Sequence, residues 1–325
     1  MITYVFTFLG EFGYELLNWQ GTIRKWSKLY KQPGDKIIIC SRKGLEQLYE
    51  FADVYINISE LDSYNNTIGD CYTCYVFTNP GADKAPRNEW QITRTGLHLD
   101  NTKEDVQKLV TNKVQDKNIK WIWSSDFIEM KGLAFGLERP GGRGGIYNEP
   151  TNKLDINNNE YIQVQPADCR DKIENKLKFN LEEPYILCQT GWRSHIGISH
   201  VEIDYESYLS EFIKNHNVIL LDFETGRSHD SHSKFENKYM NYQCESFNEQ
   251  SALIANADKC IFFTEGDFRS HLYLPPMMGK DVHIIAPQDV WNLHSAPYQF
   301  WNKNIFKFGG QIIPHVLEDE LKLKL

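Results

Sequence analysis

The sequence predicts an α/β protein with two Rossmann-like, doubly wound parallel sheets. Two observations lead to this prediction: apolar runs of strand length alternate with stretches of helical period, and a glycine-rich stretch separates two such series. The length of 325 residues fits two domains, since domains average about 150 residues. We therefore expect an N-terminal domain at 1–150 and a C-terminal domain at 151–325.

The first half alternates strands and helices in the order expected of a parallel sheet. A β-branched and aromatic strand at 2–9 ends in a loop that holds Gly10 and Gly13, and Pro33-Gly34 ends the helix that follows. The remaining elements are predicted at 36–41 (strand), 42–52 (helix), 54–58 (strand), 101–114 (helix) and 121–125 (strand). The stretch 136–153 is rich in glycine, which indicates a loop or hinge.

The second half repeats this alternation. Apolar runs predict strands at 184–190, 217–223, 259–264 and 281–287. Ser246 and Glu249 form a capping box that opens a helix through Ala257, and other helical segments follow Asp204 and extend to Met278.

Composition narrows the functional classes. A formal net charge of −9 without a local basic stripe disfavours nucleic-acid binding. No apolar run reaches the length of a membrane span and the first residues lack a basic leader, so we expect a cytoplasmic protein. The seven cysteines are odd in number, and those in apolar runs (Cys40, Cys188 and Cys260) read as reduced core residues.

The loop after the strand at 259–264 is the strongest candidate in the sequence for a ligand-binding site. Gly266 permits close approach of the backbone to a ligand, while Arg269 and His271 are hydrogen-bond donors beside Glu265 and Asp267. Ligands of open parallel sheets bind outside the carboxyl ends of strands, so this loop suits a phosphate and a ribose. The plainer alternative is a turn in which Asp267 caps a helix and Arg269 pairs with a surface acid.

A second loop, at 189–195, leaves the first strand of the same sheet. Arg193 can contact a diphosphate through two planar donors at once, or it can form an ion pair between domains. In a doubly wound order this loop would lie opposite the Glu265 loop at the switch point.

The loop after the first strand offers carboxylates at a helix start. Gly10 and Gly13 bring the backbone close to a ligand, and Glu11 could act as a general base toward an acceptor hydroxyl. Glu15 is expected to turn away from the strand end. Both acids would also be favoured there by the helix dipole alone.

The remaining candidate metal-binding residues have weaker support in the sequence. His229 and His232 lie in a serine-rich stretch that fixes no ligand geometry, and the pair Cys71 and Cys74 lacks a second pair at zinc-site spacing. No P-loop, dinucleotide fingerprint, nucleophile elbow, HExxH or DxD motif is present in the sequence. We expect neither a metal site nor a cofactor.

These features together resemble those of GT-B glycosyltransferases. The pattern FFTEGDFRSHLYLPPMMGKDVHIIAP at 262–287 is similar to the donor-site segment of the heptosyltransferase-like branch, with Glu265-Gly266-Asp267 where that branch has Asp-Thr-Gly. QTGWRSH at 189–195 is similar to the arginine-containing donor loop of GT-B fucosyltransferases. The resemblance implies two domains that face a cleft, with a nucleotide-sugar in the C-terminal domain and a glycan or lipid-linked acceptor in the N-terminal one. It also implies that the tail after Pro314 forms a closing helix that returns to the first domain.

The same resemblance implies roles for the site residues. Arg193 and Arg269 would neutralise the departing diphosphate, and Glu265 would accept hydrogen bonds from the ribose or the sugar. Gly266, Asp267 and His271 would complete the donor site; Gly10, Gly13 and Glu15 would line the acceptor side. Glu11 would be the base in an inverting reaction. A nucleotide-sugar 2-epimerase of the same fold and a noncatalytic glycan- or nucleotide-binding protein remain as alternatives.

The predicted helix after the first loop suggests a second partner. It carries aromatic and basic residues that could touch an anionic membrane holding a lipid-linked acceptor. The residues concerned are Trp19, Arg24, Lys25, Trp26, Lys28 and Lys31. A solvated helix face is the alternative.

Overall fold

The computed structural model describes residues 1–9, 15–67, 99–123, 160–189, 205–210, 212–223, 239–244, 246–264, 270–288, 291 and 305–317. The chain divides into two compact units, Met1–Tyr161 and Ile162–Leu325. The boundary predicted at residues 150 and 151 lies outside the described residues.

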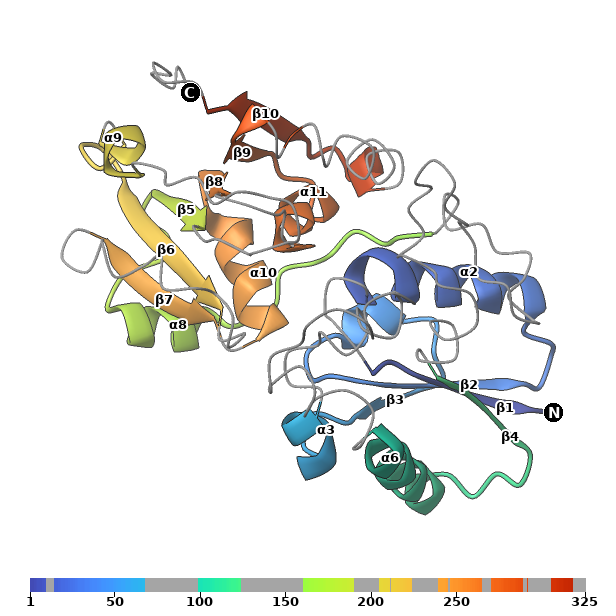
Figure 1. The fold of residues 1–325 in the computed structure, drawn as a ribbon. Helices are drawn as coiled ribbons and strands as arrows, with labels where there is room; N and C mark the ends of the chain where they lie inside the picture. Colours follow the sequence, from blue (N-terminus) through green and yellow to red (C-terminus); the bar gives the residue numbers. More distant parts are fainter. Residues whose placement is uncertain are drawn as a thin grey trace, which may run out of the picture. The chain divides into compact units, whose positions relative to one another are not determined.

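The first unit is a doubly wound parallel sheet. Its strands lie in the order β3-β2-β1-β4, and β1 (Thr3–Thr7) pairs in parallel with both β2 (Lys36–Ser41) and β4 (Ile119–Trp123). Helix α2 covers one face of the sheet, and α3 and α6 cover the other (Figure 1). The remaining elements of the unit are η1 (Glu15–Trp19, a π-helical turn), α2 (Gln20–Tyr30), η2 (Glu46–Tyr49), β3 (Val54–Asn57), α3 (Asp62–Thr67) and α6 (Leu99–Lys113).

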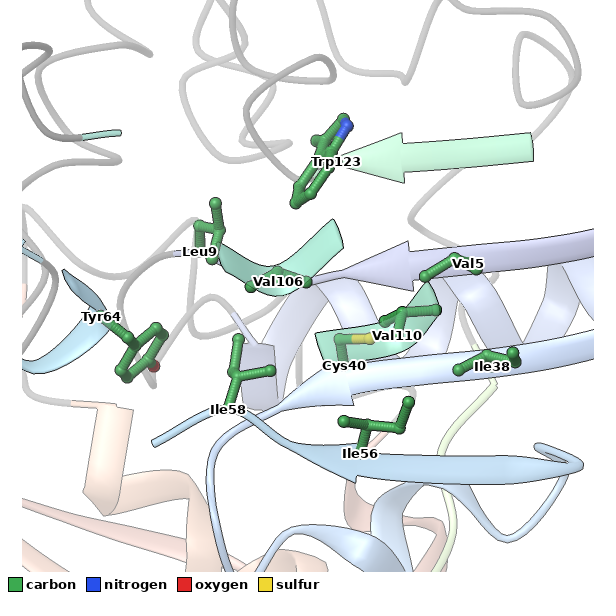
Figure 2. Close-up of a cluster of buried hydrophobic side chains, with 10 residues drawn as sticks. All are labelled: Val5, Leu9, Ile38, Cys40, Ile56, Ile58, Tyr64, Val106, Val110 and Trp123. Atoms are coloured by element: carbon green, nitrogen blue, oxygen red, sulfur yellow. The ribbon is translucent and has the colours of Figure 1, made fainter. Parts of the chain in front are cut away.

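Alternating residues of β1 build the two cores of this unit. Val5 packs with residues of the neighbouring strands and of α3 and α6 in one apolar cluster, whose members are shown in Figure 2. Phe6, on the opposite face, meets Trp26 of α2 with ring centroids 4.9 Å apart, and Tyr4 meets the same ring at 4.8 Å. This period of two is what a strand covered on both faces requires.

Helix α2 does not present the proposed membrane-binding face. Trp19, Arg24 and Trp26 are buried, because the two indoles pack on the sheet and the Arg24 guanidinium binds Glu50 and the Leu48 carbonyl. Lys28 pairs with Glu160, and Lys31 pairs with Asp53. The membrane hypothesis for this helix is therefore wrong in its aromatic part. In the part of the chain that the structure describes, no helix combines the length and apolarity needed to cross a membrane.

The second unit also contains a parallel sheet, with strands in the order β10-β9-β8-β5-β6-β7. Counted from its first strand along the chain, this is the order 3-2-1-4-5-6 of dinucleotide-binding folds read from the opposite edge. The strand order therefore confirms the predicted fold class in this unit as well. The strands are β5 (Tyr185–Gln189), β6 (Asn217–Phe223), β7 (Met240–Cys244), β8 (Lys259–Phe263), β9 (Val282–Ala286) and β10 (Ile312–Val316).

Helices flank this second sheet. α10 (Phe247–Asn256) begins at the predicted cap, where the Ser246 hydroxyl accepts a hydrogen bond from the backbone N–H of Glu249 at 3.2 Å. Its Leu253 carbonyl accepts a bond from the Tyr185 hydroxyl of β5 at 2.6 Å. The other helical elements are α8 (Arg170–Leu177), α9 (Tyr205–Leu209), η6 (Ser270–Tyr273), α11 (Leu274–Met277) and η7 (Phe306–Phe308).

Two strands depart from the sequence-based expectations. β7 was not predicted, since MNYQC has too few apolar residues to stand out. The expected closing helix is wrong for His315 and Val316, because they belong to β10, which pairs in parallel with β9. Pro314 is compatible with β10 because this strand lies at the sheet edge, where a missing N–H leaves no neighbour unpaired. Residues 318–325 lie outside the described residues.

The cysteines predicted for the core are buried. Cys40, Cys188 and Cys260 are free thiols inside the sheets, and Cys244 joins them. Burial raises the pKa of the Cys40 and Cys260 thiols to about 12, which suppresses the reactive thiolate at neutral pH. Cys71 and Cys74 lie outside the described residues.

Candidate functional site

The carboxyl ends of β5 and β8 lie side by side in the second unit. The two strands are parallel neighbours, with Gln189 in register with Phe262. β5 is followed in the chain by β6 on one side, and the order then reverses to β8 on the other side. Such a reversal marks the switch point where open parallel sheets bind ligands. The predicted loops that begin after Gln189 and after Thr264 therefore leave the sheet from adjacent strand ends.

Most of the predicted donor residues belong to those two loops. Arg193, Glu265, Gly266, Asp267 and Arg269 lie outside the described residues. The backbone of His271 is described, and it forms part of η6, which leads directly into α11.

One polar residue at this switch point was not predicted. Gln189 ends β5 with 2% of its surface exposed, and among the described residues neither its amide oxygen nor its amide nitrogen has a hydrogen-bond partner. In the sheet it is flanked by Leu221 of β6 and Phe262 of β8. The only signal in the sequence was a polar residue at the end of an apolar run, which many strands share.

In the first unit, Glu15 is the one predicted site residue after β1 that the structure describes. Gly10, Glu11 and Gly13 lie outside the described residues. Glu15 opens the π-helical turn η1, and its carboxylate is fully buried at the carboxyl end of β2. It accepts hydrogen bonds from the Ser41 hydroxyl and, at 2.7 Å, from the Tyr49 hydroxyl.

Arg42 completes this buried cluster. Its Nε lies 3.3 Å from a Glu15 carboxylate oxygen, and its guanidinium carbon lies 5.9 Å from the centre of the Phe8 ring. Burial raises the pKa of the Glu15 carboxyl, against the lowering effects of Arg42, Ser41 and Tyr49. The cluster thus ties the start of η1 to the ends of β1 and β2, next to the loop that contains Glu11.

A pH titration of stability tests this environment. Because the pKa of Glu15 is raised in the folded state, the unfolded chain releases this proton first as the pH rises from about 4. Wild type should therefore lose stability relative to Glu15→Gln between pH 4 and pH 7, by at most about 1.4 kcal/mol per pH unit. Urea unfolding of both proteins at several pH values measures the difference.

The exposed Glu183 provides the control, since Glu183→Gln should leave the pH profile of wild type unchanged. A wild-type advantage over Glu15→Gln that grows with pH would mean that Arg42 stabilises an ionised carboxylate.

A metal centre finds no support among the residues described here. No three His, Cys, Asp or Glu side chains gather closely enough to hold an ion within those ranges. The histidines predicted as a weak candidate, His229 and His232, lie outside them.

Comparison with known proteins gives similarities of fold. No family model and no curated protein sequence matches the chain. Among solved structures, a glycosyl transferase family 9 protein from Veillonella parvula is 11% identical with a TM-score of 0.45, covering 98% of this chain and 88% of that one. ADP-heptose LPS heptosyltransferase II from E. coli is 9% identical with a TM-score of 0.44, covering 96% and 90%.

A third similar structure is a putative UDP-N-acetylglucosamine 2-epimerase from Listeria monocytogenes. It is 12% identical with a TM-score of 0.34, covering 94% of this chain and 86% of that one.

Proposed function

We propose that this protein is a glycosyltransferase that moves a sugar from a nucleotide-sugar to a hydroxyl of a glycan or lipid-linked acceptor. The second unit would bind the donor, and the first unit the acceptor. The reaction would need no metal ion.

The adjacency of β5 and β8 supports this proposal most strongly. It brings the starts of two loops to one switch point, where helix N-termini and backbone N–H groups favour anions. By sequence, these two loops carry Arg193 and Arg269, and a guanidinium suits a diphosphate because its planar donors match two oxygens at once. Neutralising charge on the leaving diphosphate is the main catalytic requirement of such a transfer.

The remaining residues take the roles expected from the sequence. Glu265 would accept hydrogen bonds from the ribose or donor sugar, beside Gly266, Asp267 and His271. Glu11 would remove the acceptor proton if the reaction inverts the anomeric carbon, with Gly10 and Gly13 shaping the same loop. Glu15, buried against Ser41 and Tyr49, would hold that loop in place at the acceptor side.

Ligand screening followed by product analysis tests the function. Nucleoside diphosphates and nucleotide-sugars are screened by thermal stabilisation, since a ligand at 100 times its dissociation constant stabilises by about 2.7 kcal/mol. The best nucleotide-sugar is then incubated with the protein alone and with candidate acceptors. Sugar transfer, or slow release of free sugar, supports a transferase. An isomerised nucleotide-sugar would indicate the 2-epimerase alternative, and an unchanged one would indicate a binding protein.

Chelation provides a separate prediction. Activity should survive EDTA, because we assign the leaving diphosphate to arginines and helix N-termini rather than to a divalent ion. The rate of transfer is measured with and without EDTA, and then after adding excess Mg²⁺ or Mn²⁺. Complete loss of activity that the metal restores would contradict the metal-independent mechanism.

A further inference from the structure

Gln189 is a buried amide at the end of β5, and it has no hydrogen-bond partner within the part of the chain that the structure describes. Its neighbours in register, Leu221 and Phe262, are both apolar and fully buried, so neither side chain can bond to it. Buried amides nearly always have hydrogen-bond partners, and an exception calls for an explanation such as strain, a bound water or ion, or a functional role. Gln189 is the last residue of β5, so the loop that carries Arg193 in the sequence begins directly after it, at the carboxyl edge of the sheet.

A second buried amide belongs to the same face. Residues Tyr185 and Gln189 are four apart in one strand and so share a face, and the Tyr185 hydroxyl bonds to the Leu253 carbonyl of α10. Gln250, one helical turn before Leu253, lies nearer the helix start, which follows the carboxyl end of β7. It is 1% exposed, and its amide nitrogen also has no hydrogen-bond partner among the residues described.

We propose that Gln189, supported by Gln250, recognises the uncharged nucleoside of the donor. The inference rests on the proposed function and assigns a residue that decides which nucleotide is accepted. An amide offers one donor and one acceptor side by side, which matches the edge of a nucleobase or a pair of ribose hydroxyls. It carries no charge to attract phosphate, and the diphosphate is already assigned to arginines.

The free protein should be less stable because of this arrangement. A buried polar group without a partner destabilises the folded state, so an apolar side chain of similar size at position 189 should stabilise it. A substitution that raises stability and weakens nucleotide binding is typical of a functional residue. Substitution of a structural residue is expected to lower stability instead.

The experiment compares Gln189→Leu and Gln189→Met with wild type. For each protein, a melting curve is recorded, and ADP, GDP, UDP, CDP and inorganic pyrophosphate are titrated by calorimetry. The control is Gln20→Leu, which removes a buried glutamine of the first unit whose amide nitrogen donates to the Leu16 carbonyl at 3.1 Å. Among the described residues its amide oxygen has no partner, so this variant loses one hydrogen bond that Gln189 does not make.

We expect wild type to bind one nucleoside diphosphate more tightly than pyrophosphate. In both Gln189 variants that affinity should fall about 10- to 100-fold toward the affinity for pyrophosphate, which itself should not change. Their melting temperatures should rise by about 2–4 °C, whereas that of Gln20→Leu should fall without an effect on nucleotide binding.

Several results would overturn the inference. If either folded Gln189 variant binds the nucleotide as tightly as wild type does, Gln189 is not part of the site. The proposed function would be unaffected by that result. An equal loss for pyrophosphate would show that the residue acts on the phosphates. If wild type binds none of the four nucleoside diphosphates, both the inference and the proposed function fail.

Discussion

Replacing Trp26 with alanine should lower the free energy of unfolding by about 3–5 kcal/mol, the range for removing a large aromatic side chain from a core. Trp26 is 1% exposed and joins α2 to the first sheet through Tyr4 and Phe6. Its loss leaves a cavity between α2 and β1. Urea unfolding of Trp26→Ala and wild type measures the difference.

The matched control lies on the same helix. Lys28 is exposed and pairs with Glu160, so Lys28→Ala should change stability by no more than about 1 kcal/mol, as for other surface ion pairs. If Trp26→Ala is also within about 1 kcal/mol of wild type, then α2 does not pack on the sheet through this side chain.

Replacing Arg193 with alanine should weaken the binding of nucleoside diphosphates by about 1.5–3 kcal/mol, the range for a hydrogen bond to a charged group. The melting temperature should hardly change, because a phosphate-binding arginine has no buried acid as its partner. If Arg193 did pair with a buried acid, its removal would leave that charge uncompensated and destabilise the protein. Arg193→Lys should restore little affinity, since an ammonium cannot make the two-pronged contact. Calorimetric titration and a melting curve for each variant give both quantities.

Arg170 supplies a control arginine in the same unit. It is exposed on α8 and pairs with Glu174 and Glu182, so Arg170→Ala should bind nucleotides as wild type does. Unchanged nucleotide affinity in folded Arg193→Ala would remove Arg193 from the donor site. A loss of several kcal/mol in stability would instead identify a structural ion pair.

The sequence predicts the elements of these sheets best where they are most apolar. The strands KIIICS and NVILLDF have the predicted bounds, because continuous apolar runs are what a sheet buried on both faces needs. The helical period of 42–52 yields only the short turn η2, since Leu48 and Tyr49 can be buried in a single turn. β7 was missed because an edge strand tolerates polar residues, and β10 was missed because the residues after its proline were assigned to a closing helix.

The candidate sites were predictable to a different extent. The neighbouring strand ends of the second unit follow from the doubly wound order, so the position of the switch point was foreseeable. The partners of Glu15 were not, because Ser41 and Tyr49 lie 26 and 34 residues away and no local pattern links them. Gln189 was missed for the same reason: the lack of a partner is a property of the packed sheet and cannot be read from a strand sequence.

Hydrogen exchange with and without a bound nucleotide tests the central claim most directly. The nucleoside diphosphate that stabilises the protein most in the thermal screen is added, and exchange of backbone amides is followed peptide by peptide. The account predicts slower exchange in peptides that cover residues 189–195 and 264–271, at the ends of β5 and β8. Protection confined to peptides of the first unit, with those two segments unchanged, would contradict it.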